Sequence, residues 1–250
     1  MTVSKYSEVY PSSHLALPDD EVHIWHVALD DPVLGLEKLE QTLSTDECMR
    51  ASRFHFERDR RHFVVGRGML RSILGLYLKT EPEKLRFSYG VYGKPSLLDD
   101  SGDNTLRFNL AHSHGLAIYG FVRNREIGID LEYIYRIPDI DQIAERFFSK
   151  YENSVLRKLS TDEKQEAFFN CWTRKEAYIK ATGNGLACPL DQFDVSLMPG
   201  EPARLLRVNG DKKEASRWSL EALTLDPGYV GALAVAGHDW QVRHWKWSNK

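Results

Sequence analysis

The segment 127–132 carries two carboxylates at a spacing that could bind a cation. It reads Ile-Gly-Ile-Asp-Leu-Glu, and this alternation of apolar residues predicts a β-strand. Side chains alternate faces along a strand, so Asp130 and Glu132 share one face, about 7 Å apart. Their repulsion is unfavourable unless a cation or a basic group lies between them, and Gly128 beside them would let a ligand approach the backbone. The alternative is the solvated face of an edge strand.

A third carboxylate lies in the segment 171–180, which reads Cys-Trp-Thr-Arg-Lys-Glu-Ala-Tyr-Ile-Lys. Trp172, Glu176 and Lys180 recur every four residues and therefore lie along one stripe of a predicted helix. Aromatic and aliphatic neighbours mark the core-facing side, so Glu176 borders the apolar face. With the strand pair, Glu176 would complete an oxygen site suited to Mg²⁺, which keeps phosphate oxygens and water as its other ligands. The alternative is a Glu176–Lys180 ion pair at the surface, which contributes little.

Basic residues that could bind phosphate come earlier in the chain. Arg50 begins an arginine-rich helical stretch, Lys94 lies in a Gly-Lys-Pro turn, and His112 follows a predicted strand. The alternatives are a solvated helix face for the arginines and a structural role for His112. The sequence has no P-loop and no Gly-x-Gly-x-x-Gly motif, no Gly-x-Ser-x-Gly elbow and no zinc-like His/Cys cluster. These absences argue against an ordinary kinase, a Rossmann enzyme, a serine hydrolase and a zinc enzyme.

The elements that must position these residues alternate between strands and long helices. Strands are expected at 22–29, 85–89, 106–110, 116–122, 127–133, 193–197, 204–208, 218–225, 229–236 and 240–245. Helices are expected at 46–79, 140–159 and 162–181. Three Ser-x-x-Glu capping boxes, beginning at Ser44, Ser149 and Ser160, support helix starts. The order predicts an α/β fold of the α+β type with two halves of similar layout, residues 1–124 and 125–250, and a ligand cleft between them.

Composition limits the class of protein. The formal net charge of −3 over 250 residues includes no long basic run, which argues against nucleic acid and membrane surfaces as partners. No apolar stretch reaches the roughly 18 residues of a membrane span, and residues 1–13 lack the apolar core of a secretory signal. Three cysteines without a pairing pattern predict a reducing, cytoplasmic location.

Read in order, these segments resemble the Sfp-type 4′-phosphopantetheinyl transferases. The resemblance covers residues 44–235, most of the chain. Its markers are Gly-Arg-Gly-Met-Leu-Arg at 66–71, Tyr-Gly-Lys-Pro at 92–95, Asn-Leu-Ala-His-Ser at 109–113, the acidic strand at 127–132, Arg-Phe-Phe-Ser at 146–149 and the helix segment at 172–180.

The resemblance implies a monomeric pseudo-dimer of two α/β halves that binds coenzyme A in the cleft and modifies a serine of an acyl or peptidyl carrier protein. By matching positions, Asp130, Glu132 and Glu176 would hold Mg²⁺ against the coenzyme A pyrophosphate, and Lys180 would approach the same phosphates. His112 and Arg50 would face the 3′-phosphate, and Lys94 with its turn would border the nucleotide. Glu176 is also the expected acceptor of the serine proton, directly or through water.

The chain departs from the family pattern at two places. Ala111 replaces the usual Ser before His112, and Glu47 stands where the family has a basic residue three positions before Arg50. Each change removes one expected contact to phosphate. Two other functions stay open at this point: a Mg²⁺-dependent hydrolase of nucleotide pyrophosphates, and a non-catalytic module that binds carrier proteins. The pathway of the carrier, whether fatty-acid, polyketide or nonribosomal-peptide synthesis, also stays open.

Overall fold

The first part of the chain forms most of one sheet and its helices. In the computed structural model the described residues are 7–9, 15–98, 105–183 and 185–247. The elements up to residue 123 are β1 (Ser7–Val9), β2 (Glu21–Ala28), α1 (Leu36–Glu40), α2 (Thr45–Ala51), α3 (Glu57–Leu78), β3 (Phe87–Tyr89), β4 (Pro95–Leu97), β5 (Leu106–Ser113) and β6 (Leu116–Arg123). Short 3₁₀ turns at Pro32–Leu34 and Pro82–Lys84 connect them.

The second part repeats the order of strand, helices and strands. Its elements are β7 (Ile127–Tyr133), α4 (Ile140–Phe147), α5 (Lys150–Leu156), α6 (Thr161–Thr182), β8 (Phe193–Val195), β9 (Leu205–Val208), α7 (Lys212–Ala215), β10 (Trp218–Ala222), β11 (Tyr229–Ala236) and β12 (Gln241–Trp247). The mixed α+β class expected from the sequence is confirmed.

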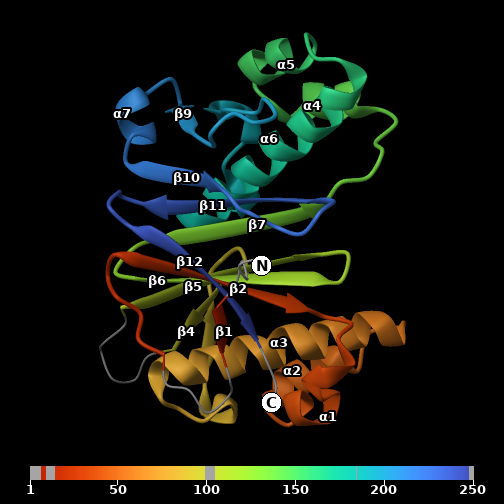
Figure 1. The fold of residues 1–250 in the computed structure, drawn as a ribbon, viewed down its shortest axis with the longest axis vertical. Helices are drawn as coiled ribbons and strands as arrows, with labels where there is room; N and C mark the ends of the chain where they lie inside the picture. The colour runs from red at the N-terminus through yellow and green to blue at the C-terminus, as the bar shows by residue number, and fades with distance from the viewer. Residues whose placement is uncertain (1–6, 10–14, 99–104, 184, 248–250) are drawn as a thin grey trace, which may run out of the picture.

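Two sheets lie face to face between two helical layers (Figure 1). One sheet has the strand order β1-β12-β2-β6-β5 and the other β10-β11-β7. Helix α3 covers the outer face of the first sheet, and α6 packs on β7 and β11 of the second. The expected division at residues 124/125 falls between β6 and β7. Strand β12 nevertheless crosses back and pairs in parallel with β1 and β2, so the first sheet is not continuous in sequence. The pseudo-two-fold relation of the halves stays a prediction.

The face that the two sheets share is apolar. On β7, Ile127, Ile129 and Leu131 are buried together with Ile24 of β2 and Ile118 of β6. Because strand side chains alternate, the opposite face of β7 carries the two carboxylates and meets α6. The edges of the two sheets adjoin where β5 runs beside β7. There the buried side-chain oxygen of Asn109 accepts a hydrogen bond from the Ile129 amide at 2.9 Å, which joins the two sheets at this edge.

Two of the three predicted helices are interrupted. The helix expected at 46–79 is α2 followed by α3, which begins after an extended Phe56. The helix expected at 140–159 is α4 followed by α5, because the Ser149–Glu152 capping box ends one helix and begins another. All three capping boxes are present. Capping satisfies amides that the first turn of a helix leaves unpaired, so each box marks a true start.

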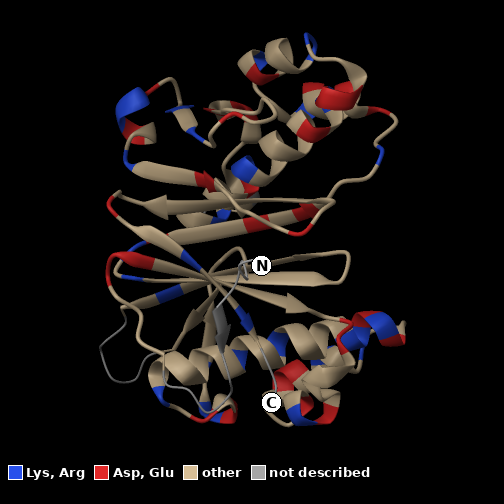
Figure 2. Ribbon diagram, viewed as in Figure 1, with Lys and Arg blue, Asp and Glu red and all other residues tan. Residues whose placement is uncertain are grey.

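Charged residues of both signs are interspersed over the outer helices, while the strands carry few (Figure 2). Among the described residues, no helix is both long enough and apolar enough to cross a membrane.

Candidate active site

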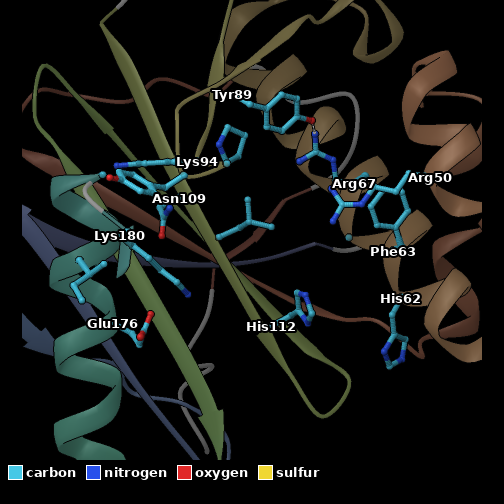
Figure 3. A pocket seen from close by; sticks show the side chains of 18 of the residues that line it. Arg50, His62, Phe63, Arg67, Tyr89, Lys94, Asn109, His112, Glu176 and Lys180 are labelled. Atoms are coloured by element: carbon cyan, nitrogen blue, oxygen red, sulfur yellow. Dashed lines mark hydrogen bonds between the residues drawn. The ribbon is translucent and has the colours of Figure 1, made fainter. Parts of the chain in front are cut away.

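A cavity of about 670 Å³ lies between α3 and α6, over the edge strand β5. Figure 3 shows Glu176 and Lys180 on α6 facing Arg50, Arg67 and His62 across this cavity, with His112 between them and Asn109 beside Lys180. The cavity therefore draws its walls from both parts of the chain, as the expected cleft required.

Helix α6 lies directly on β7 because residue 128 has no side chain. A Cβ atom on Gly128 would come within 2.0 Å of the Ala177 carbonyl oxygen and 2.2 Å of the Ala181 amide nitrogen. The expectation that Gly128 leaves room for a ligand is therefore wrong, since the space is filled by the helix backbone. This close contact brings the acidic face of β7 under the side chains of Glu176 and Lys180.

Asp130 is buried beneath α6 and pairs with Lys180. The Lys180 ammonium donates to Asp130 Oδ1 at 2.6 Å, and the carboxylate is only 5% exposed. The solvated edge strand and the surface Glu176–Lys180 pair, the two alternatives considered above, are both wrong here. Burial raises the pKa of Asp130, although the Lys180 charge opposes the rise. Its other oxygen, Oδ2, is buried and has no hydrogen-bond partner in the described part of the chain.

Glu132 and Glu176 complete the acidic group. Burial raises the pKa of Glu132, and repulsion from Asp130 adds to the rise, although the Ser113 hydroxyl donates to Glu132 Oε2 at 3.1 Å. The pKa of Glu176 is raised by burial first, then by Asp130 and Glu132, with Lys180 opposing. Asp130 thus acts on the pKa of both glutamates, and Glu132 acts on that of Glu176, so the three form one acidic group, of which Glu176 lines the cavity.

The acidic group has the donor chemistry of a Mg²⁺ site, but its side chains do not form a complete set of metal ligands. Within the described ranges, no three His, Cys, Asp or Glu side chains converge as closely as a bound metal requires, and Lys180 occupies one oxygen of Asp130. Two observations fit a cation nonetheless. Asp130 Oδ2 is a buried oxygen with no hydrogen-bond partner among the described residues, and Asp130 raises the pKa of both Glu132 and Glu176, so the three carboxylates offer a hard-oxygen donor set.

The predicted phosphate-binding residues lie in different situations. Arg50 is exposed and its guanidinium lies 5.2 Å from the centre of the Phe63 ring. The His112 ring is exposed within the cavity, yet the surrounding walls lower its pKa by removing water, and the charges of Lys180 and His62 add to this effect. Both side chains line the cavity, as expected.

Lys94 lines the same cavity with its stem, but its ammonium is occupied elsewhere. It donates to the carbonyl oxygens of Ile127 at 3.1 Å and Ala181 at 3.2 Å, and it lies 3.6 Å from Glu126. The ammonium therefore ties the 92–95 turn to the end of α6 and the start of β7, and the turn as a whole borders the cavity.

Several lining residues were not predicted. Helix α3 contributes Asp59, His62, Phe63 and Gly66, together with Arg67 of the arginine-rich stretch that was a candidate for binding phosphate. These residues recur at intervals of three and four and so form one helical stripe. That periodicity was visible in the sequence, but an arginine-rich helix gives no sign of which stripe faces a ligand. His62 is held from outside the cavity, where its Nε2 lies 2.7 Å from Asp30 Oδ1.

Comparisons with known proteins identify the family of this chain. Residues 126–235 match the model of the 4′-phosphopantetheinyl transferase superfamily, and residues 34–119 match that of the 4′-phosphopantetheinyl transferase N-terminal region. The 4′-phosphopantetheinyl transferase HetI of Nostoc sp. (strain PCC 7120 / SAG 25.82 / UTEX 2576) is 47% identical over 93% of this chain and 94% of its own length. The 4′-phosphopantetheinyl transferase Sfp of Bacillus subtilis (strain 168) is 31% identical over 86% of this chain and 93% of its own.

The fold comparison gives a more distant similarity. The holo-[acyl-carrier-protein] synthase of Thermotoga maritima superposes with a TM-score of 0.36 at 22% identity, covering 45% of this chain and 62% of that one. On the sequence matches, the chain belongs to the 4′-phosphopantetheinyl transferase superfamily.

Proposed function

We propose that this chain transfers the 4′-phosphopantetheine arm of coenzyme A to a serine of an apo carrier protein, releasing adenosine 3′,5′-bisphosphate. The observation that carries the proposal is one continuous cavity whose two ends carry different charged groups. Glu176 and Lys180 lie at one end, where Lys180 also pairs with Asp130, and Arg50 and Arg67 lie at the other. Coenzyme A likewise carries two separate phosphate groups, a pyrophosphate and a 3′-phosphomonoester. A pyrophosphate suits a site with carboxylates and a metal, and a phosphomonoester suits guanidinium groups.

Asp130, Glu132 and Glu176 would hold the Mg²⁺ ion. When bound, the ion would neutralise charge on the pyrophosphate and on the leaving group. Lys180 is the cation that the chain itself supplies at this end, and its ammonium already neutralises Asp130. With Mg²⁺ on the carboxylates, the Lys180 ammonium would be available to the same phosphate oxygens.

The chemistry needs no nucleophile from this chain. The carrier serine Oγ would attack the phosphorus of the phosphate next to pantetheine, and the bond from that phosphorus to the oxygen of the adenosine bisphosphate would break. The serine proton would pass to Glu176 or to a water beside it. Glu176 lines the cavity, and a general base must lie within reach of the proton that it accepts. Holding both substrates in one cavity supplies much of the acceleration.

The proposal includes the state and setting of the enzyme. A single chain supplies both walls of the cavity, which supports a monomer as the active form. Cys48, Cys171 and Cys188 are all free thiols, which supports a reducing cytoplasmic compartment. The carrier proteins proposed are those of fatty-acid, polyketide or nonribosomal-peptide synthesis.

The direct test incubates the chain with coenzyme A, Mg²⁺ and apo carrier proteins of the three pathways, and measures their intact mass. A gain of one phosphopantetheine unit, absent when the carrier serine is replaced by alanine, supports the proposal. Release of adenosine bisphosphate without any carrier would favour the hydrolase. Binding of carrier that ignores Mg²⁺ and leaves its mass unchanged would favour the binding module.

A further inference from the structure

A buried carboxylate on α2 fixes two arginines of α3. Glu47 is 2% exposed, and its Oε1 accepts from Arg67 Nε at 2.8 Å and lies 2.6 Å from Arg67 Nη2. Its Oε2 accepts from Arg71 Nε at 2.7 Å. Arg71 is fully buried and also donates to two backbone carbonyls, those of Pro82 and Leu85. Arg71 is therefore structural, whereas Arg67 reaches the cavity.

Arg67 is held rigidly from three sides. Besides Glu47, its Nη2 donates to the Tyr89 hydroxyl at 2.7 Å, and its guanidinium lies 4.9 Å from the centre of the Phe87 ring. The remaining nitrogen, Nη1, makes no hydrogen bond within the part of the chain that the structure describes. A planar guanidinium fixed in this way presents its last N–H groups in one orientation, which favours recognition of an oxyanion.

Arg67 and Arg50 meet at one end of the cavity. Figure 3 shows Arg67 between Tyr89 and Arg50, and both arginines line the large cavity and an adjoining one of about 210 Å³. Asp46 lines the adjoining cavity and Asp59 the large one, both with exposed side chains. Glu47, the buried acid, is shared between Arg67 and Arg71, so it does not cancel both positive charges.

We infer that Arg67 binds the 3′-phosphate of coenzyme A and that Glu47 is a positioning residue which aims it. The inference rests on the proposed function and deepens it. The acidic end of the cavity is suited to the pyrophosphate, so the phosphomonoester falls to the arginine end. In the sequence, Glu47 stands where the family has a basic residue. In the structure it orients the guanidinium of Arg67 on the next helix. Arg67 then distinguishes coenzyme A from its 3′-dephospho form.

The test compares kcat/KM for coenzyme A and 3′-dephospho-coenzyme A with an apo carrier. Arg67→Gln should lower the value for coenzyme A on the order of tenfold, the usual effect of losing a charged hydrogen bond, and change the value for the dephospho form less than about twofold. Arg67→Lys should lie between. Glu47→Gln should reduce the same ratio by less. Arg60→Gln is the matched control, because Arg60 is on α3 but pairs with Glu40 and Glu57 outside the cavity.

The ratio of the two kcat/KM values is measured on the same preparation of each variant, so a partly unfolded preparation lowers both values equally and leaves the ratio unchanged. A loss that is equal for both substrates, or no loss, would overturn the inference. If the wild-type chain modifies no carrier, the proposed function fails, and calorimetric binding still decides the role of Arg67. Wild-type preference for adenosine 3′,5′-bisphosphate over adenosine 5′-monophosphate, abolished in Arg67→Gln, supports it. Equal binding of the two nucleotides by wild type and variant contradicts it.

Discussion

Replacing Glu132 by Gln should stabilise the metal-free protein while weakening its response to Mg²⁺. Glu132 lies on the same face of β7 as Asp130, with burial and Asp130 both raising its pKa. The change removes one negative charge and keeps the size of the side chain and a hydrogen-bonding group for Ser113. The acidic group is therefore expected to cost stability when no cation is bound.

The size of the effect follows from the strand spacing. Two unit charges about 7 Å apart in a medium of effective dielectric about 20 repel by roughly 2 kcal/mol. Attraction to Lys180 and solvent screening at this half-buried residue offset part of that repulsion. A net gain of about 1 kcal/mol corresponds to a rise of roughly 2–4 °C in Tm for a chain of this size.

The gain should depend on pH in a definite direction. Because the pKa of Glu132 is raised above its ordinary value of 4.5, the folded state binds the proton more tightly than the unfolded state. The unfolding free energy of the wild type therefore falls, through this group, as pH rises from 4.5 through the folded-state pKa. The variant lacks this loss, so its Tm advantage should be small near pH 4.5 and largest at neutral pH.

Differential scanning fluorimetry with EDTA and then with increasing Mg²⁺ measures both effects. Wild type should gain Tm with Mg²⁺, because a ligand that binds only the folded state stabilises it, and Glu132→Gln should gain less. Glu126→Gln is the control: Glu126 precedes the same strand but lies near Lys94 and Arg107, so its removal should not stabilise. A lower metal-free Tm in Glu132→Gln, with an undiminished Mg²⁺ response, would show that Glu132 neither repels Asp130 nor takes part in binding the ion.

Three further predictions concern the frame of the site. Gly128→Ala should destabilise the protein by about 1–3 kcal/mol or more, because α6 must move off β7. Gly66→Ala is the control: an added Cβ there has no neighbour nearer than 3.9 Å, so the change should be neutral or stabilising. Chemical denaturation measures the unfolding free energy of both variants. Lys175→Met should cost about 3–5 kcal/mol, because it leaves the fully buried Glu152 carboxylate without its cation, and an unchanged unfolding midpoint would argue against that pairing. Asn109→Ala should cost about 1–3 kcal/mol by leaving the buried Ile129 amide without its acceptor, and hydrogen exchange at that amide should accelerate.

The local sequence pattern was sufficient to predict those elements whose bounds depend on a single feature, such as an apolar run or a capping box. Strands 127–133 and 229–236 were predicted with the bounds of β7 and β11, because short apolar runs between turns leave little choice. The capping boxes marked true helix starts, and Ser149 shows the limit of periodicity. Its capping box lies inside the predicted helix 140–159. The box caps the first turn of α5, so a new helix begins there and α4 has already ended.

Non-local choices could not be derived from local pattern. Strand β12 joins the first sheet by pairing with residues more than 200 positions earlier, and nothing in its own sequence specifies that partner. The pairing of Lys180 with Asp130 across 50 residues likewise depends on the packing of α6 over Gly128. The sequence singled out these charged residues, but only the packing decided which charges meet. Glu47 and Arg67 illustrate the same point, since both carry charges whose role depends on the neighbouring helix.

The most direct test of the central claim is to quantify both products of one reaction, holo carrier by intact mass and adenosine 3′,5′-bisphosphate by chromatography. The two products should form in equal amounts and only when carrier is present. EDTA should abolish both and Mg²⁺ restore them, and both should be lost in Asp130→Asn and Glu176→Gln variants that remain folded. Full transfer by either variant, or nucleotide release without any mass gain on the carrier, would contradict the central claim.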